Sequence, residues 1–162
     1  MSYPRTIESS EFYRLRGYLD AIQDFTITGN HEALFDLFLY DLTQSEFDPF
    51  EIFQMAYANE ELEKANLIKC TAGEMIEEAN SALRLSFEPL NIQPVPSERM
   101  EYANRFNLPG FWEQIKACAN YETGAIFKYD AEFKHSNLYW SFAYIIYSQQ
   151  EGSYLILHGG GS

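Results

Sequence analysis

The sequence predicts an α+β protein in which an N-terminal bundle of about five or six helices, over residues 1–120, precedes a three-stranded antiparallel sheet over residues 124–158. Two patterns predict this order. Apolar residues recur at helical spacing up to about residue 119, and aromatic and β-branched residues dominate from residue 125 onward. A length of 162 residues with 46% apolar content fits a single domain, 1–162. The three prolines at 86–97 predict an internal connection within it.

The first helix is expected to begin at Ser9 or Ser10, whose hydroxyl groups suit the N-cap position, and to end within 26–30. Leu15 and Leu19 are four positions apart, so both would lie on its buried face.

Residues 31–43 are expected to form a second helix, because their leucines and phenylalanines would cover more than half of its circumference. A narrow polar ridge would remain along it. Glu32, Asp36 and Tyr40 follow one another at spacings of four and would form this ridge.

A third helix is expected from Asp48, which can cap it, to about Tyr57, because Pro49 is pre-set for the first helical position. Thr71 and Glu74 repeat the capping pattern at the start of another helix. Residues 60–69 between them fit either a short helix or a continuation of a neighbouring one.

Two more helices are expected at 97–106 and 111–119, separated by Pro109 and Gly110. Three strands then follow at 125–129, 137–147 and 153–157, with a hairpin loop at 149–152. One face of the central strand would pack on the helices, and its residues are Leu138, Trp140, Phe142, Tyr144 and Ile146. The closing residues 159–162 are read as a frayed end or an added linker.

The formal net charge is −13, and it is concentrated in one segment. Between Gly17 and Glu63 there are eleven carboxylates and no Lys or Arg, and nine aromatic residues are interleaved with them. Aromatic residues at this density predict a folded acidic face rather than a disordered tail. Such a face attracts basic partners, and without a basic cluster direct nucleic-acid binding is not expected. High net charge also aids solubility, which is the alternative explanation.

The carboxylates and one tyrosine of this segment are the candidate partner-binding residues. They are Asp20, Asp24, Glu32, Asp36, Tyr40, Asp41, Glu46, Glu60, Glu61 and Glu63. Asp48 and Glu51 are left out because capping of a helix explains them.

The two cysteines, Cys70 and Cys118, lie far apart without a neighbouring histidine, so neither a zinc site nor a disulfide framework is signalled. No cofactor and no metal are predicted. An apolar leader and a stretch long enough to cross a membrane are both lacking, and a cytoplasmic protein is expected.

Candidate catalytic groups are sparse, and no enzyme is predicted. Asp130, Glu132 and His135 lie within six residues, a set that can bind a divalent metal or act in acid–base chemistry, but these residue types also dominate exposed loops. His158 and the glycines after it match the HGGG string of lipases, yet no GxSxG accompanies it. Glu74, Glu77 and Glu78 lack the Glu-x-x-His partner of di-metal bundles, and His31 is read as a surface residue near a cap.

A resemblance adds to this reading of the residues. In size, acidity, lack of a catalytic motif, an expected layout of helices followed by strands, and its segments 140–146 and 154–157, the chain resembles the immunity proteins of contact-dependent inhibition and other polymorphic toxin systems. The resemblance implies an inhibitor that covers the basic surface of a cognate toxin, with a nuclease as the expected toxin. A nucleic-acid mimic that blocks another enzyme would use the same mechanism.

The alternative is a small enzyme or ligand-binding protein with a pocket between the helices and the aromatic sheet, lined by Trp140 and Tyr144. A closed interface between helices and sheet would count against this alternative.

Overall fold

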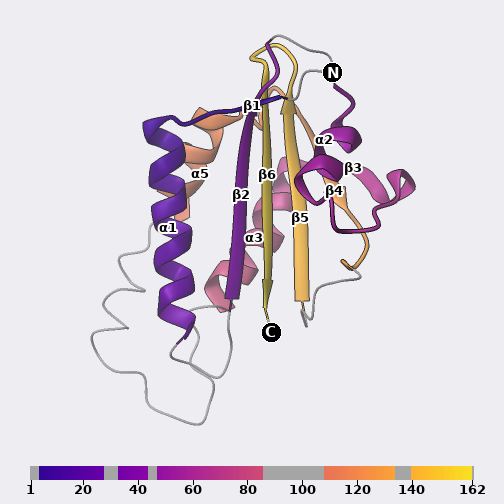
Figure 1. Ribbon diagram of the computed structural model, residues 1–162. Coiled ribbons are helices and arrows are strands. Elements are labelled where there is room, and N and C mark those ends of the chain that lie inside the picture. Colours follow the sequence, from indigo (N-terminus) through magenta and orange to yellow (C-terminus); the bar gives the residue numbers. More distant parts are fainter. Residues whose placement is uncertain (1–3, 28–32, 44–46, 86–107, 134–139, 162) are drawn as a thin grey trace.

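Six antiparallel strands in the order β1-β2-β6-β5-β4-β3 form one sheet in the computed structural model, which describes residues 4–27, 33–43, 47–85, 108–133 and 140–161 (Figure 1). The strands are β1 Arg5–Thr6, β2 Ala33–Asp41, β3 Leu67–Cys70, β4 Ala125–Tyr129, β5 Trp140–Ser148 and β6 Ser153–Gly161. The helices are α1 Ser10–Ile27, α2 Pro49–Ala56, the short 3₁₀ helix η1 Lys64–Asn66, α3 Ala72–Leu85 and α5 Leu108–Cys118.

The predicted order of a helical bundle followed by three strands is wrong. Helices and strands alternate along the chain, and β2 and β3 both lie within the part predicted to be helical. Strands are present at the three predicted C-terminal positions, as β4, β5 and β6, and they are neighbours in the sheet. The third extends four residues beyond its predicted end at 157, and residues 137–139 of the second lie outside the described residues. The sheet has twice the predicted number of strands because segments distant in sequence join it at both sides.

Three helix starts follow the predicted capping residues. The Ser9 hydroxyl accepts a hydrogen bond from the amide of Phe12 at 3.2 Å, and Asp48 accepts one from Phe50 at 2.8 Å. Thr71 and Glu74 form a reciprocal capping box, with bonds of 2.9 and 3.2 Å. These interactions satisfy amides that have no partner within a helix, so the short-range signals were read correctly.

Residues 33–41 form a strand, β2, and not the predicted helix. Alternate side chains are buried on one face. There Phe35, Leu37 and Leu39 belong to the apolar cluster that includes residues of α1, α3 and α5. Asp36 and Tyr40 lie on the opposite face. A segment this rich in leucine and phenylalanine fits a strand that is buried on both faces and also a helix that is buried on all sides. The spacing of its apolar residues therefore cannot distinguish a strand from a helix. The segment is a strand because its nine residues pair with nine residues of β6.

The C-terminal glycines are part of the sheet and not a frayed end. β6 continues to Gly161 and lies between β2 and β5, with nine residue pairs to each. Every residue of β6 is buried. Gly159, Gly160 and Gly161 are therefore held on both sides by backbone pairing.

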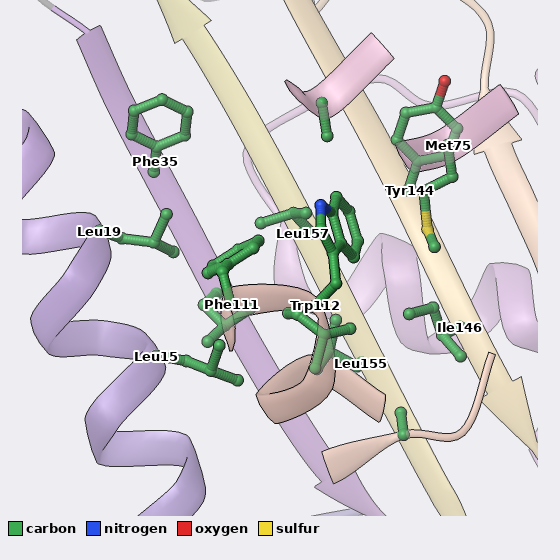
Figure 2. Packing of buried hydrophobic residues seen from close by; sticks show 14 of the residues in the cluster. Leu15, Leu19, Phe35, Met75, Phe111, Trp112, Tyr144, Ile146, Leu155 and Leu157 are labelled. Atoms are coloured by element: carbon green, nitrogen blue, oxygen red, sulfur yellow. The ribbon is translucent and has the colours of Figure 1, made fainter. Parts of the chain in front are cut away.

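Two apolar clusters lie on the two faces of the sheet. The larger joins the sheet to α1, α3 and α5, and Figure 2 shows Phe111 and Trp112 of α5 packed between Leu15 and Leu19 of α1 and Leu155 and Leu157 of β6. Phe142, Tyr144 and Ile146 belong to this cluster, as predicted for their face of β5. The smaller cluster lies under α2.

Several predictions fall outside the described residues. These are the proline-rich connection at 86–97, the helix at 97–106, and the side chains of Leu138 and Trp140. The ambiguous stretch 60–69 contains η1 and leads into β3. No helix within the described ranges is long and apolar enough to cross a membrane.

Candidate functional site

The face of the sheet that carries α2 brings acidic and aromatic side chains together. Asp36, Phe38 and Tyr40 alternate along β2, so all three point to this face. The rings of Phe38 and Tyr40 are nearly parallel, with centroids 6.4 Å apart, and both are half-buried. The side chain of Asp36 is 50% exposed, so its carboxylate is available beside the two rings.

Helix α2 covers this face with an aromatic cluster. Phe53 is fully buried, and its ring centroid lies 5.2 Å from that of Tyr57 and 5.2 Å from that of Tyr129. Phe133 lies 4.9 Å from Tyr57 by the same measure. These contacts hold Tyr57, at the end of α2, against the ring of Phe38 at 5.8 Å.

A histidine on the central strand joins this cluster. His158 is the direct cross-strand partner of Asp36, and its Nδ1 lies 3.3 Å from Asp36 Oδ2. An ionised carboxylate only accepts hydrogen bonds, so the Nδ1 proton donates to Asp36. His158 is only 8% exposed. Its ring centroid lies 4.7 Å from that of Phe133, with the two rings tilted, and 5.4 Å from that of Tyr57, in an edge-to-face contact.

Two buried polar atoms of the cluster have no hydrogen-bond partner among the described residues. They are the hydroxyl of Tyr57 and Nε2 of His158. Tyr154 belongs to the same cluster, and its hydroxyl donates to the carbonyl of Pro49 at 2.6 Å. Burial raises the pKa of Tyr57, and the charges of Asp36 and Tyr40 add to this effect. Burial likewise raises the pKa of Tyr154.

These tyrosines predict an alkaline limit to stability. Both pKa values are raised above the ordinary value of 10.0, so the stabilisation that the neutral phenols provide is complete below pH 10 and is lost as the pH rises further. We expect the free energy of unfolding to fall by about 1.4 kcal/mol per pH unit for each tyrosine above pH 10. Urea unfolding from pH 8 to pH 11.5 measures this slope.

Tyr154→Phe should remove one tyrosine's share of the slope, whereas Tyr13→Phe, at an exposed position of α1, should leave the slope unchanged. Equal slopes for the wild type and both variants would contradict the assignment.

The structure divides the predicted partner-binding residues into groups. Asp36 and Tyr40 lie on the α2 face, and Glu60, Glu61 and Glu63 follow α2 in the chain. The amide of Glu63 donates to the hydroxyl of Tyr129 at 3.0 Å, which ties this loop to the same face. The loop carboxylates and the β2 residues therefore belong to one side of the sheet.

The other predicted residues are elsewhere or not described. Asp20 is exposed on α1, across the sheet from Asp36. Asp41 ends β2, where its carboxylate accepts from the amide of Thr43 at 2.9 Å, a bond that lowers the pKa of Asp41. The side chains of Asp24, Glu32 and Glu46 lie outside the description.

Sequence reasoning missed Phe38, Tyr57 and His158 as members of this site. A period of two at Asp36, Phe38 and Tyr40 is the signal that finds the first of them once β2 is read as a strand. His158 was assigned to a chain end, so nothing in its local sequence pointed to a partner on β2. Its pairing depends on contacts between residues 122 positions apart.

The other candidate sites are explained by structural roles. Burial raises the pKa of Cys70 and of Cys118 to about 11, so neither thiol is a ready nucleophile at neutral pH. The carboxylate of Glu74 accepts from the Thr71 amide in the capping box of α3, and Glu78 pairs with Lys128 at 3.0 Å. His31 and His135 lie outside the described residues, and the described part of the chain holds no group of three or more metal-binding side chains.

The packing of Tyr144 counts against the predicted pocket. Its ring is buried between β5 and Met75 of α3, in a closed part of the larger cluster (Figure 2). Helices and sheet are in direct contact there.

Comparison with known proteins finds the same fold elsewhere. No protein family matches the sequence, and no curated protein does. A crystal structure of citrus MAF1 matches with a TM-score of 0.63 at 10% identity, over 89% of this chain and 98% of the other. Citrus MAF1 in a second crystal form gives a TM-score of 0.60 at 10% identity, covering 88% of this chain and 97% of the other.

These findings overturn the hypothesis of a toxin-immunity protein and, with it, that of a toxin partner. The resemblance relied on a layout of helices followed by strands, and the six-stranded sheet with interleaved helices replaces that layout. This chain is similar in fold to citrus MAF1.

Proposed function

We propose that this chain is a protein-binding regulator of the MAF1 kind, with a nucleic-acid enzyme as its partner. The observation that carries the proposal is the shared fold, which extends over 89% of this chain and 98% of the citrus protein. MAF1 is a non-enzymatic, protein-binding repressor of RNA polymerase III, so this polymerase is the proposed target. The expectation that the chain is not an enzyme agrees with this likeness.

The charge of the chain supports a partner of this class. An enzyme that holds nucleic acid needs cationic surfaces to neutralise phosphates, and a protein of net charge −13 is complementary to such surfaces. Electrostatic attraction of this kind speeds association, while buried aromatic anchors provide most of the lasting affinity.

The α2 face is the proposed contact surface. Asp36 offers a half-exposed carboxylate next to the parallel rings of Phe38 and Tyr40, an arrangement that suits an arginine side chain through an ion pair and a cation–π contact. Glu60, Glu61 and Glu63 add acidic side chains on the same side. A single domain and a cytoplasmic location stay predictions of the sequence.

A binding measurement with purified RNA polymerase III tests this proposal. We expect a complex that weakens as salt rises, because surface charges are screened. The double variant Asp36→Asn with Glu63→Gln removes two charges from the α2 face and should weaken binding about tenfold at low salt. Asn at position 36 retains an acceptor for His158, so the fold is preserved.

The matched control is Asp20→Asn with Glu113→Gln, which removes two charges from exposed positions on α1 and α5. It should bind like the wild type. Absence of a complex with the wild-type chain would refute the polymerase as partner, and equal weakening by both double variants would refute the α2 face as the contact surface.

A further inference from the structure

Strand β3 is the outermost strand of the sheet and pairs with β4 alone among the described strands. The carbonyl of Asn66 accepts from the amide of Asp130 at 2.8 Å, and Ile68 lies opposite Lys128. Backbone groups alternate in direction along an antiparallel strand, so Asn66, Ile68 and Cys70 face β4. Leu67 and Lys69 therefore turn their backbone groups to the open edge.

Three backbone groups remain at this edge. The Leu67 amide donates to the carbonyl of Lys64 and closes η1. The carbonyl of Leu67, together with the amide and carbonyl of Lys69, has no partner in the described part of the chain. These three groups have the spacing with which one β-strand bonds to a neighbouring strand. The edge is therefore a template on which a further strand can pair.

The side chains at the edge leave room for a neighbour. Ile68 is 43% exposed, although isoleucine is normally buried, and Lys69 is exposed as well. An added strand would cover Ile68 and remove apolar surface from water.

The surroundings of the edge are acidic. Glu61 and Glu63 precede β3, Glu74 and Glu77 follow it on α3, and Asp130 is bonded to Asn66, directly before β3; all five are exposed. The nearby cations are largely neutralised, since Lys64 pairs with Asp48 at 2.9 Å and Lys128 with Glu78 at 3.0 Å. A second copy of this chain at the edge would bring two such acidic surroundings together, so charge disfavours self-pairing and favours a basic segment.

We propose that the open edge of β3 accepts an extended segment of a partner protein, rich in Lys and Arg, as a seventh strand of the sheet. The segment would bond to Leu67 and Lys69, place an apolar side chain on Ile68, and set basic side chains against the carboxylates at both ends of β3. This mode of recognition draws its affinity from backbone hydrogen bonds and its selectivity from the flanking side chains. The backbone groups of the edge lie apart from Asp36 and Tyr40, although Glu61 and Glu63 border both surfaces. The peptide test contains no polymerase, so the proposal does not depend on the polymerase as partner.

The test uses the full chain labelled with ¹⁵N and two capped octapeptides, one alternating Lys with Val and one alternating Glu with Val. The Lys peptide should shift the amide signals of residues 67–70 and slow hydrogen exchange of the Lys69 amide at least fivefold. The Ile68 amide faces β4 and is an internal control, since it is protected before peptide is added. Equal effects of both peptides, or shifts confined to residues 36–40, would overturn the proposal.

Lys69→Pro removes the outward donor without loss of a bond to β4, and it should weaken binding of the Lys peptide at least tenfold. Lys69→Ala retains the amide and should bind at least as tightly as the wild type, because it also removes a like charge. If Lys69→Pro binds like Lys69→Ala, backbone pairing at β3 is refuted. If Lys69→Pro does not fold, the exchange of the Lys69 amide in the wild-type chain decides the question.

Discussion

Gly159→Val is expected to lower the free energy of unfolding by about 3 kcal/mol, because a side chain there has no space. A Cβ atom at Gly159 would lie 2.7 Å from Cε1 and Cζ of Phe142 and 2.9 Å from Cδ1 of Phe35. Both rings are buried, on the two strands that flank β6. Their displacement would disturb the packing of three adjacent strands, and urea unfolding followed by circular dichroism would measure the loss.

Gly17→Ala is the matched control for a change at glycine. Nothing lies within 4 Å of a Cβ built at Gly17, which is exposed inside α1. Alanine has the higher helix propensity, so this variant should gain about 1 kcal/mol. If the two substitutions gave similar changes, the close approach of Phe35 and Phe142 to Gly159 would have no energetic consequence.

Local signals were sufficient to predict where most helices begin. Caps at Ser9, Asp48 and Thr71 depend on residues within three positions, and each is present in the structure. The strand β2 shows the opposite case. Its apolar residues fit a buried helix and a buried strand equally well. Whether the segment is a helix or a strand depends on pairing with β6, whose residues are more than a hundred positions away.

Part of the candidate site was predicted in spite of this error. Positions four apart share a face in a helix, where the period is 3.6, and also in a strand, where it is 2. Asp36 and Tyr40 were therefore placed on one face by a wrong assignment of secondary structure. Phe38 was missed because it lies on the same face as Asp36 and Tyr40 in a strand but not in a helix. His158 was missed because only the pairing of β6 with β2 brings it beside Asp36.

The end of the chain was misjudged for a related reason. A run of glycines has no side-chain pattern and little preference for a strand, so local sequence reads as a loose end. In the sheet the absence of side chains is the useful property, because β6 passes directly beneath Phe35 and Phe142 at Gly159. The role of these glycines is visible only once β6 is paired with β2 and β5.

Phe53→Ala is expected to lower the free energy of unfolding by about 4 kcal/mol, since it removes a fully buried ring from the cluster under α2. The ring contacts Tyr57, Tyr129 and Phe133, none of which can fill the space without leaving its other partners. The same change should weaken partner binding, because Tyr57 would no longer be held against Phe38. Urea unfolding and the polymerase binding assay would measure the two effects.

Phe50→Ala separates the loss of this particular ring from the loss of any aromatic residue on α2. Phe50 lies on the same helix, three positions earlier, and is only half-buried, so its truncation should cost about 1 kcal/mol. A loss of stability as large as that of Phe53→Ala would mean that α2 itself, and not the buried ring, determines the stability of this face. If Phe53→Ala weakens binding while Phe50→Ala does not, the aromatic cluster positions the contact surface, and the acidic and aromatic side chains of β2 depend on the core beneath α2 for their arrangement.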